Sequence, residues 1–275
     1  MDAVFSNLLF VDECLLDEKR VKKFKSAIKK SVKPGDIVVD AGTGSGIIAL
    51  FAARAGAKKV YALELDPYIA KIAEHNVRAN KLEHIVKVVN TDVRKFRLPQ
   101  GEVADILTME MLDTGLIAEH QAGAIIKLRE NKVINNKTKL LPERALFYVA
   151  AIDYGFDFYG FLMPMIVQAR NDGVLPKIRH LMSSEQCYSD INFKEIRSID
   201  YSGTLKLKIL RSGMVNAIRL STVIFLNGRK CNATSDMNMP VIIPIKPRQV
   251  KKGDIMKFKM KYVMGKGFGG FKIKE

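Results

Sequence analysis

Apolar runs of strand length recur along the first part of the chain, and amphipathic segments lie between them. Short apolar runs bounded by turn residues are typical of buried strands, and apolar positions three and four residues apart are typical of helices. Strands that alternate with helices predict an α/β fold with a doubly wound, Rossmann-like parallel sheet. The expected strands cover residues 37–41, 59–64, 86–91 and 103–109, and the expected helices cover residues 45–55 and 67–80.

A lysine-rich amphipathic segment precedes this sheet. Val21, Phe24 and Ile28 fall on one side of a helix over residues 18–30, with lysines on the other side. Pro34 and Gly35 end this helix. We expect its apolar side to cover other apolar residues.

Beyond Pro142 the pattern changes to β-rich runs. Within residues 205–209, leucine and isoleucine alternate with lysine, as in a half-exposed strand. This part predicts a β-barrel-like antiparallel domain. The chain then divides into a helical cover at residues 1–34, a Rossmann-like domain at 35–142 and the barrel-like domain at 143–275. The expected strands of the last domain cover residues 145–152, 204–210, 217–226, 241–245 and 255–263.

The composition narrows the class of protein. The longest apolar runs, residues 46–53 and 145–152, have eight residues each, against about 18 for a membrane span. The first ten residues carry an acid and no base, so we expect no export signal, no membrane and a cytoplasmic location. Three dispersed cysteines and four histidines without ligand spacing predict neither disulfides nor a metal site.

The net charge of +16 is uneven along the chain. Residues 1–145 hold 24 Lys and Arg against 19 Asp and Glu, whereas residues 146–275 hold 21 against 10. The basic second half indicates either a surface for RNA or an acidic partner, or a solvated lysine-rich face.

The first strand runs into a glycine-rich turn. Residues 38–46 read Val-Val-Asp-Ala-Gly-Thr-Gly-Ser-Gly, so that Gly42, Gly44 and Gly46 follow Asp40. Glycines let the backbone approach a ligand closely. Ile47 stands where a dinucleotide-binding turn has its third glycine. S-adenosylmethionine has no phosphate and carries an ammonium, so this acid-containing turn favours it as the cofactor.

Further acids follow the other predicted strands. Glu64 ends the second strand, where an acid can bind both ribose hydroxyls, and Asp92 follows the third, where it or its backbone could meet an adenine amino group. Glu110 follows the fourth. Because the carboxyl ends of parallel strands share one edge, we expect these acids to gather with Asp40 around a bound ligand.

Residues 14–152 resemble the protein arginine methyltransferases. The run Leu15-Leu16-Asp17-Glu18-Lys19-Arg20 is similar to the family's helical element, which implies that Arg20 grips the cofactor carboxylate. The glycine turn resembles motif I, and Glu64 its ribose-binding acid. The run Asp105-Ile106-Leu107-Thr108-Met109-Glu110 resembles the strand before the family's double-glutamate loop, whose second glutamate falls nine residues on, at Glu119. The resemblance implies Glu110 and Glu119 as the catalytic pair.

Two glutamates suit a guanidinium acceptor. A guanidinium is protonated at pH 7 and is a poor nucleophile, and paired carboxylates can bind it bidentately and draw its charge to one side. Transfer from a sulfonium needs mainly in-line positioning. The resemblance thus implies a protein substrate, with a homodimer among the expected assemblies.

The chain departs from the family at several positions. Phe5 stands where the family has a tyrosine, residues 235–237 replace a Thr-His-Trp loop, and there is no tryptophan. Arg94 stands at the position where the family has the acid that contacts adenine, so we assign the adenine contact to Asp92 instead. The segment between Tyr154 and Tyr159 is shorter than the family's dimerisation arm.

Two other functions stay open at this point. The basic second half favours an RNA methyltransferase, although Met109-Glu110-Met111-Leu112 lacks the proline and aromatic residues usual for base-amino methylation, and no cysteine nucleophile is near. The third reading is a cofactor-binding scaffold without turnover, which the presence of both glutamates disfavours.

Overall fold

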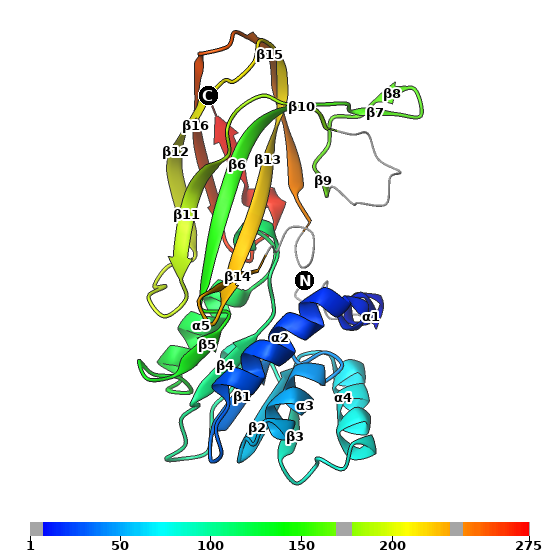
Figure 1. Ribbon diagram of the computed structural model, residues 1–275, viewed down its shortest axis with the longest axis vertical. Helices are drawn as coiled ribbons and strands as arrows, with labels where there is room; N and C mark the ends of the chain where they lie inside the picture. Colours follow the sequence, from blue (N-terminus) through cyan, green and yellow to red (C-terminus); the bar gives the residue numbers. More distant parts are fainter. Residues whose placement is uncertain (1–7, 169–177, 232–238, 275) are drawn as a thin grey trace.

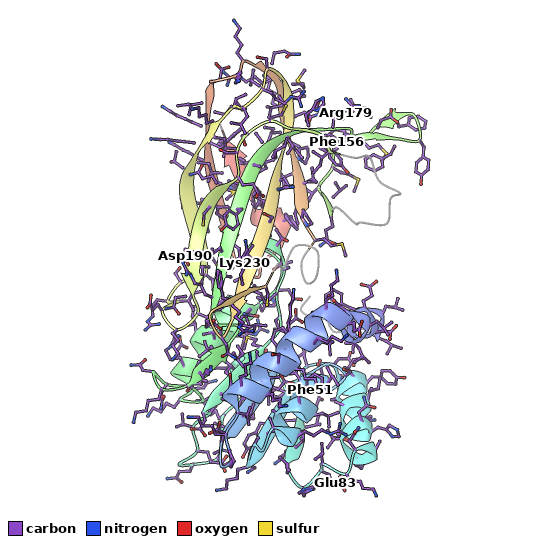
Figure 2. All side chains as sticks on the ribbon, in the orientation of Figure 1. Phe51, Glu83, Phe156, Arg179, Asp190 and Lys230 are labelled. Carbon is purple, nitrogen blue, oxygen red and sulfur yellow. The ribbon has the colours of Figure 1, made fainter. Side chains whose placement is uncertain are left out.

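The computed structural model describes residues 8–168, 178–231 and 239–274. Helices surround a parallel sheet in one part of the molecule, and long antiparallel strands build the other part (Figure 1). Figure 2 shows Phe156 and Arg179 in the antiparallel part and Glu83 at the opposite end. Phe5 and residues 235–237 lie outside the described residues.

Five parallel strands form the first sheet. They are β1 (Ile37–Ala41), β2 (Lys59–Glu64), β3 (Val86–Asn90), β4 (Ile106–Met109) and β5 (Lys139–Leu141), in the order β3-β2-β1-β4-β5. The order reverses direction between β1 and β4, and ligands bind at such switch points in open α/β sheets. The predicted parallel sheet is confirmed.

Five α-helices accompany this sheet in the described ranges: α1 (Leu8–Leu16), α2 (Glu18–Ser31), α3 (Ile47–Arg54), α4 (Pro67–Ala79) and α5 (Gln121–Glu130). Helix α2 begins where the Asp17 side chain accepts a hydrogen bond from the backbone N–H of Arg20, and it buries Phe24 and Ile28 as its pattern predicts. Helix α3 begins two residues later than expected, because Gly46 has a left-handed φ of 84°. The sequence pattern did not reveal α1. None of the helices in the described ranges has the length and apolar character needed to cross a membrane.

Short 3-10 turns interrupt the loops at η1 (Val93–Lys95), η2 (Thr114–Leu116) and η3 (Phe268–Gly270). The first occupies the loop after β3 in which no helix was expected. The second lies in the loop between β4 and α5.

The second part of the chain is antiparallel, as predicted. Its largest sheet has the order β10-β6-β13-β15-β9, with β11 also paired to β6 and β14 to β13, and a smaller sheet has the order β12-β16-β17. An isolated bridge between Ser183 and Ile209 joins the two regions. The strands are β6 (Arg144–Tyr154), β7 (Asp157–Phe158), β8 (Phe161–Leu162), β9 (Val167–Gln168), β10 (Ile178–Leu181), β11 (Gln186–Asn192), β12 (Asp200–Lys208), β13 (Gly213–Leu226), β14 (Arg229–Cys231), β15 (Val241–Val250), β16 (Ile255–Val263) and β17 (Lys272–Lys274).

The two parts share one apolar core. Buried residues of the parallel sheet, α2 and the antiparallel strands belong to a single cluster. Asn227 links the parts directly, because its side chain accepts from the Ser31 hydroxyl at 3.0 Å and donates to the Ala27 carbonyl at 3.0 Å. Helix α2 is therefore fixed to the turn between β13 and β14.

Candidate active site

A hollow lies at the carboxyl ends of β1, β2 and β4, under helices α1 and α2. It contains about 1180 Å³ of space not filled by atoms, which includes open solvent. Seven of the nine site residues predicted from the sequence line it: Arg20, Gly42, Gly44, Glu64, Asp92, Glu110 and Glu119. The other two, Asp40 and Gly46, lie behind this lining.

The glycine turn forms one wall of the hollow. Gly42 has a φ of +74°, and a Cβ there would lie 2.9 Å from the Cγ of Met111, so a side chain would clash. Gly44, with a φ of +52°, donates its backbone N–H to Oε2 of Glu64 at 3.0 Å. Gly46 instead packs against helix α4, where a Cβ would lie 3.6 Å from that of Ala73. Gly46 precedes the first residue of α3 and is not among the residues that line the hollow.

Asp40 supports the turn from behind. Only 1% of the residue is exposed, and its carboxylate accepts hydrogen bonds from the hydroxyls of Thr43 at 2.6 Å and Thr108 at 2.7 Å. Burial raises the pKa of Asp40 to about 6, although the two hydroxyls oppose this rise. The Asp40 oxygens thus bind threonines that hold the turn in place, and a direct contact of Asp40 with the cofactor stays a prediction.

Glu64 is oriented by three backbone N–H groups. Oε2 accepts from Gly44, and Oε1 accepts from Leu65 at 2.8 Å and Asp66 at 3.0 Å. The residue is 4% exposed and lines the hollow. A carboxylate fixed in this way has the preorganisation that recognition of two neighbouring hydroxyls requires.

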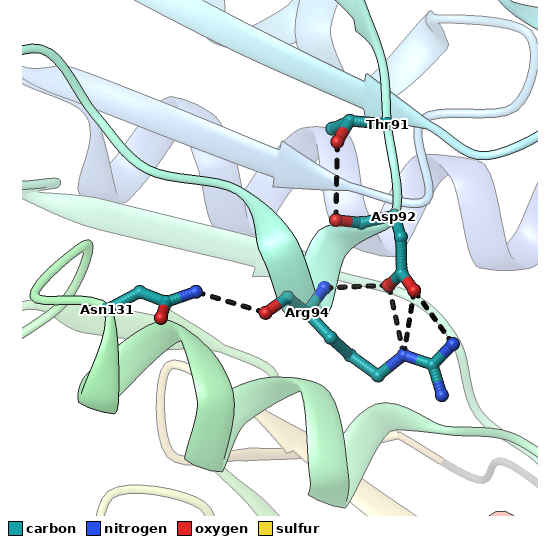
Figure 3. Close-up of polar contacts among 4 residues, drawn as sticks. All are labelled: Thr91, Asp92, Arg94 and Asn131. Carbon is teal, nitrogen blue, oxygen red and sulfur yellow. Dashed lines mark hydrogen bonds and ion pairs between the residues drawn. The ribbon is translucent and has the colours of Figure 1, made fainter.

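Asp92 and Arg94 form an ion pair at the other end of the hollow (Figure 3). The Asp92 carboxylate accepts from the Arg94 backbone N–H at 2.8 Å and from Nη2 at 2.8 Å. These contacts lower the pKa of Asp92. Asn131 donates to the Arg94 carbonyl at 3.0 Å. The sequence suggested that either the Asp92 carboxylate or the neighbouring backbone could contact the adenine amino group. Because the carboxylate is already bound by the Arg94 guanidinium, the backbone is the better candidate for this contact.

Glu110 and Glu119 both face the hollow. Nη2 of Arg20 lies 2.7 Å from Oε2 of Glu110, whose side chain is 8% exposed. Burial raises the pKa of Glu110 to about 7, and the nearby Arg20 opposes this rise. Burial, followed by repulsion from Asp113 and Glu110, raises the pKa of Glu119 to about 9. A cation bound next to these two carboxyl groups would lower their pKa values and favour their ionised forms.

Asp113 fixes the backbone at Glu119, and the sequence reasoning missed it. Its Oδ2 accepts from the N–H of Ala118 at 2.9 Å and its Oδ1 from the N–H of Glu119 at 3.1 Å. Burial raises the pKa of Asp113 to about 7. The one feature of the sequence that pointed to Asp113 is its position as an acid between the two glutamates, in a segment that is otherwise mostly apolar.

The antiparallel part holds the same loop from the other side. The Tyr262 hydroxyl on β16 donates to the Gly115 carbonyl at 2.9 Å, and the Gly265 N–H donates to the Leu116 carbonyl at 2.9 Å. The N–H of Gly115 donates to the Thr222 hydroxyl at 3.0 Å. Residues from both sheets thus position the loop that carries Glu110 and Glu119.

Sequence comparisons identify the class of enzyme. A family model described as the TRM5/TYW2 methyltransferase domain matches residues 14–150. An uncharacterized protein of Methanocaldococcus jannaschii is 29% identical over 94% of this chain and 93% of its own length. Protein arginine N-methyltransferase 8-B of Danio rerio is 28% identical, and the match covers 80% of this chain and 56% of that protein. Protein arginine N-methyltransferase 1 of Caenorhabditis elegans is also 28% identical, over 75% of this chain and 64% of its own length.

Solved structures share the whole architecture. The Trypanosoma brucei PRMT1 enzyme-prozyme heterotetrameric complex with AdoHcy contains a chain with a TM-score of 0.79 at 17% identity, covering 94% of this chain and 88% of that one. Arabidopsis thaliana protein arginine methyltransferase 10 has a TM-score of 0.77 at 19% identity, covering 94% and 89%. These likenesses confirm the predicted parallel sheet followed by an antiparallel domain. With the family match and the related sequences, they show that this chain is a class I methyltransferase that uses S-adenosylmethionine and resembles the protein arginine methyltransferases.

Proposed function

We propose that this enzyme methylates a guanidinium nitrogen of an arginine in a protein substrate, with Glu110 and Glu119 as the catalytic pair. The observation that carries this proposal is the presence of two buried carboxyl groups on one hollow, both with raised pKa values. Burying two like charges is costly unless a cation neutralises them. A guanidinium supplies that charge and two parallel N–H groups for a carboxylate.

The formal charges of the lining residues support a cationic acceptor. Among the described residues, two arginines, Arg20 and Arg94, face four acids: Glu64, Asp92, Glu110 and Glu119. With neutral histidine the lining carries two excess negative charges. S-adenosylmethionine has a net charge of +1, and a guanidinium adds another, so the filled site is neutral. With a neutral acceptor Glu119 would keep its proton, because its pKa is raised to about 9, whereas a bound guanidinium favours the ionised carboxylate.

Glu110 and Glu119 would bind and orient the acceptor during methyl transfer. Glu110 and Glu119 accept N–H groups of the acceptor and hold its remaining nitrogen toward the methyl donor, and they can take up the proton released on transfer. When bound, S-adenosylmethionine supplies an electrophilic methyl group on sulfur. Most of the acceleration then comes from positioning, because transfer from a sulfonium requires in-line approach and little covalent help.

Cofactor binding is assigned to the rest of the lining. Glu64 binds the ribose hydroxyls, the turn at Gly42 and Gly44 passes close to the cofactor, and the backbone beside Asp92 meets the adenine. Arg20 binds the cofactor carboxylate with N–H groups that the Glu110 ion pair leaves available, since a guanidinium has five. Asp40 acts through Thr43 and the turn.

We also infer that two copies of this chain associate through the β7–β8 hairpin, which extends sideways from the antiparallel part (Figure 1). Its side chains Tyr159, Phe161 and Leu162 are 95%, 71% and 79% exposed. Helix α1 offers a second apolar surface, with Leu9 at 77% exposure. Light scattering should give a dimer mass for the wild type and a monomer mass for the double variant Phe161→Ser, Leu162→Ser. An unchanged mass of the double variant would reject this interface.

The cytoplasmic location expected from the composition stays a prediction.

Label transfer to defined peptides tests the acceptor. The enzyme should label an arginine-containing peptide from methyl-labelled cofactor, and should not label the same peptide with lysine in place of arginine. Glu110→Gln should lose this activity while calorimetry shows unchanged cofactor binding, and the surface variant Glu83→Gln should keep both. Equal labelling of the two peptides, or labelling of RNA alone, would reject the arginine proposal.

A further inference from the structure

Seven lysines cover the outer face of the sheet β12-β16-β17. The opposite face of this sheet is apolar and buried, with residues such as Leu207 and Phe258 at 1% exposure. All seven lysines are exposed, and they are called the lysine face here: Lys206, Lys208, Lys257, Lys259, Lys261, Lys272 and Lys274.

The strand register sets these lysines directly opposite one another. Lys206 pairs with Lys257 across β12 and β16, and both Lys259 and Lys261 have lysine partners on β17. Like charges directly opposite each other on neighbouring strands destabilise a sheet. The arrangement is therefore unfavourable for folding, and a bound anion would remove the repulsion.

The protein itself offers little compensation. Asp200, the first residue of β12, is the acid on this face within the described strands, and it lies several residues from Lys206. No ion pair between described residues involves any lysine of the face. The positive charge is thus open to an external partner.

The chemistry of the face favours phosphates over an acidic protein. Protein interfaces are depleted in lysine and depend on buried aromatic or aliphatic anchors, whereas this face has Ile255 as its exposed apolar residue. Phosphate backbones are bound mainly by lysine and arginine, with release of counterions. Alternate residues of a strand lie about 6.6 Å apart and neighbouring strands about 4.8 Å apart, so the lysines form a regular grid.

We propose that the lysine face binds the phosphate backbone of single-stranded RNA without sequence preference. A single strand is flexible, so it can lie along the flat grid of lysines and bring successive phosphates to them. Strand β16 also leads to the active site, because Tyr262 follows Lys261 and contacts the loop of the two glutamates. RNA on this face would lie across the sheet from that loop, because Lys261 and Tyr262 point to opposite sides of the strand.

Salt-dependent binding of a labelled oligonucleotide tests this inference with the full chain. A fluorescent single-stranded RNA of mixed sequence is titrated at several salt concentrations, with wild type and with the triple variant Lys257→Gln, Lys259→Gln, Lys261→Gln. The matched control is Lys58→Gln, Lys71→Gln, Lys87→Gln, which removes the same charge from exposed positions of the other part. The face variant should flatten the slope of log K against log salt by about 2 and weaken binding about 100-fold at 0.1 M salt.

The outcomes separate the inference from general attraction. The control variant should weaken binding by less than threefold. The face variant should keep its activity on an arginine peptide, and its melting temperature should not fall, because removing lysines lessens the repulsion across the strands. Equal weakening by both variants, or no effect of the face variant, would overturn the inference. Equally strong binding of polyglutamate would overturn the choice of RNA. Because activity on the peptide is measured separately, failure here leaves the proposed acceptor untouched.

Discussion

Replacing Glu119 by glutamine should make the cofactor-free protein more stable at alkaline pH while stopping turnover. The pKa of Glu119 is raised to about 9, mainly by burial and then by Asp113 and Glu110. The folded state therefore binds this proton more tightly than the unfolded chain, so the free energy of unfolding falls as the pH rises from about 4.5 toward 9. Glutamine cannot ionise and escapes this loss.

The size of the effect follows from the pH interval. Each unit between the two pKa values is worth about 1.4 kcal/mol, so the advantage of Glu119→Gln should grow by about 4 kcal/mol between pH 5 and pH 8. For a protein of this size, that corresponds to a rise of roughly 10 °C in Tm relative to wild type. Comparing two pH values cancels the packing difference between glutamine and a neutral glutamic acid.

Differential scanning calorimetry of the cofactor-free protein at both pH values is the assay. Glu83→Gln is the control, because Glu83 lies on the surface far from the hollow (Figure 2) and should give the same small change at pH 5 and pH 8. If the Tm difference between Glu119→Gln and wild type were the same at both pH values, the burial argument for the glutamate pair would be refuted.

Three further variants test the other parts of the site. Glu64→Ala should weaken cofactor binding at least 100-fold in calorimetry, because it removes both ribose contacts of about 1.5 kcal/mol or more each; unchanged binding would reject the ribose assignment. Asp113→Asn should lower kcat about tenfold and leave the KM for S-adenosylmethionine unchanged, since an amide leaves one backbone N–H of the glutamate loop without an acceptor; a change confined to KM would contradict this. Tyr262→Phe removes the hydrogen bond to the Gly115 carbonyl and should cost about 1–2 kcal/mol of unfolding free energy in urea titrations, whereas an unchanged midpoint would show that the loop does not depend on this bond.

The parallel sheet could be predicted because its strands are short apolar runs with clear turn residues between them. The start of α3 was predicted two residues too early, at residue 45, because the left-handed backbone of Gly46 cannot be recognised from the sequence alone. The short strands between Tyr154 and Gln186 could not be predicted, because two to four residues are too few to show a period.

The sequence predicted most of the residues that line the hollow, but it did not predict the contacts among them. That Asp40 faces Thr108 depends on the register of β1 against β4, which sequence spacing does not provide. The ion pair of Arg20 with Glu110 joins residues 90 positions apart through the packing of α2 over the sheet. Asp113 was not predicted because an acid between two glutamates does not by itself indicate hydrogen bonds to backbone N–H groups.

The acceptor is the central claim, and one labelling experiment tests it most directly. The enzyme is incubated with methyl-labelled S-adenosylmethionine and a cell lysate, which is then divided for treatment with protease or ribonuclease. The account predicts that the macromolecular label is lost after protease, survives ribonuclease and is recovered as methylarginine after hydrolysis. Label that survives protease and disappears with ribonuclease would contradict it.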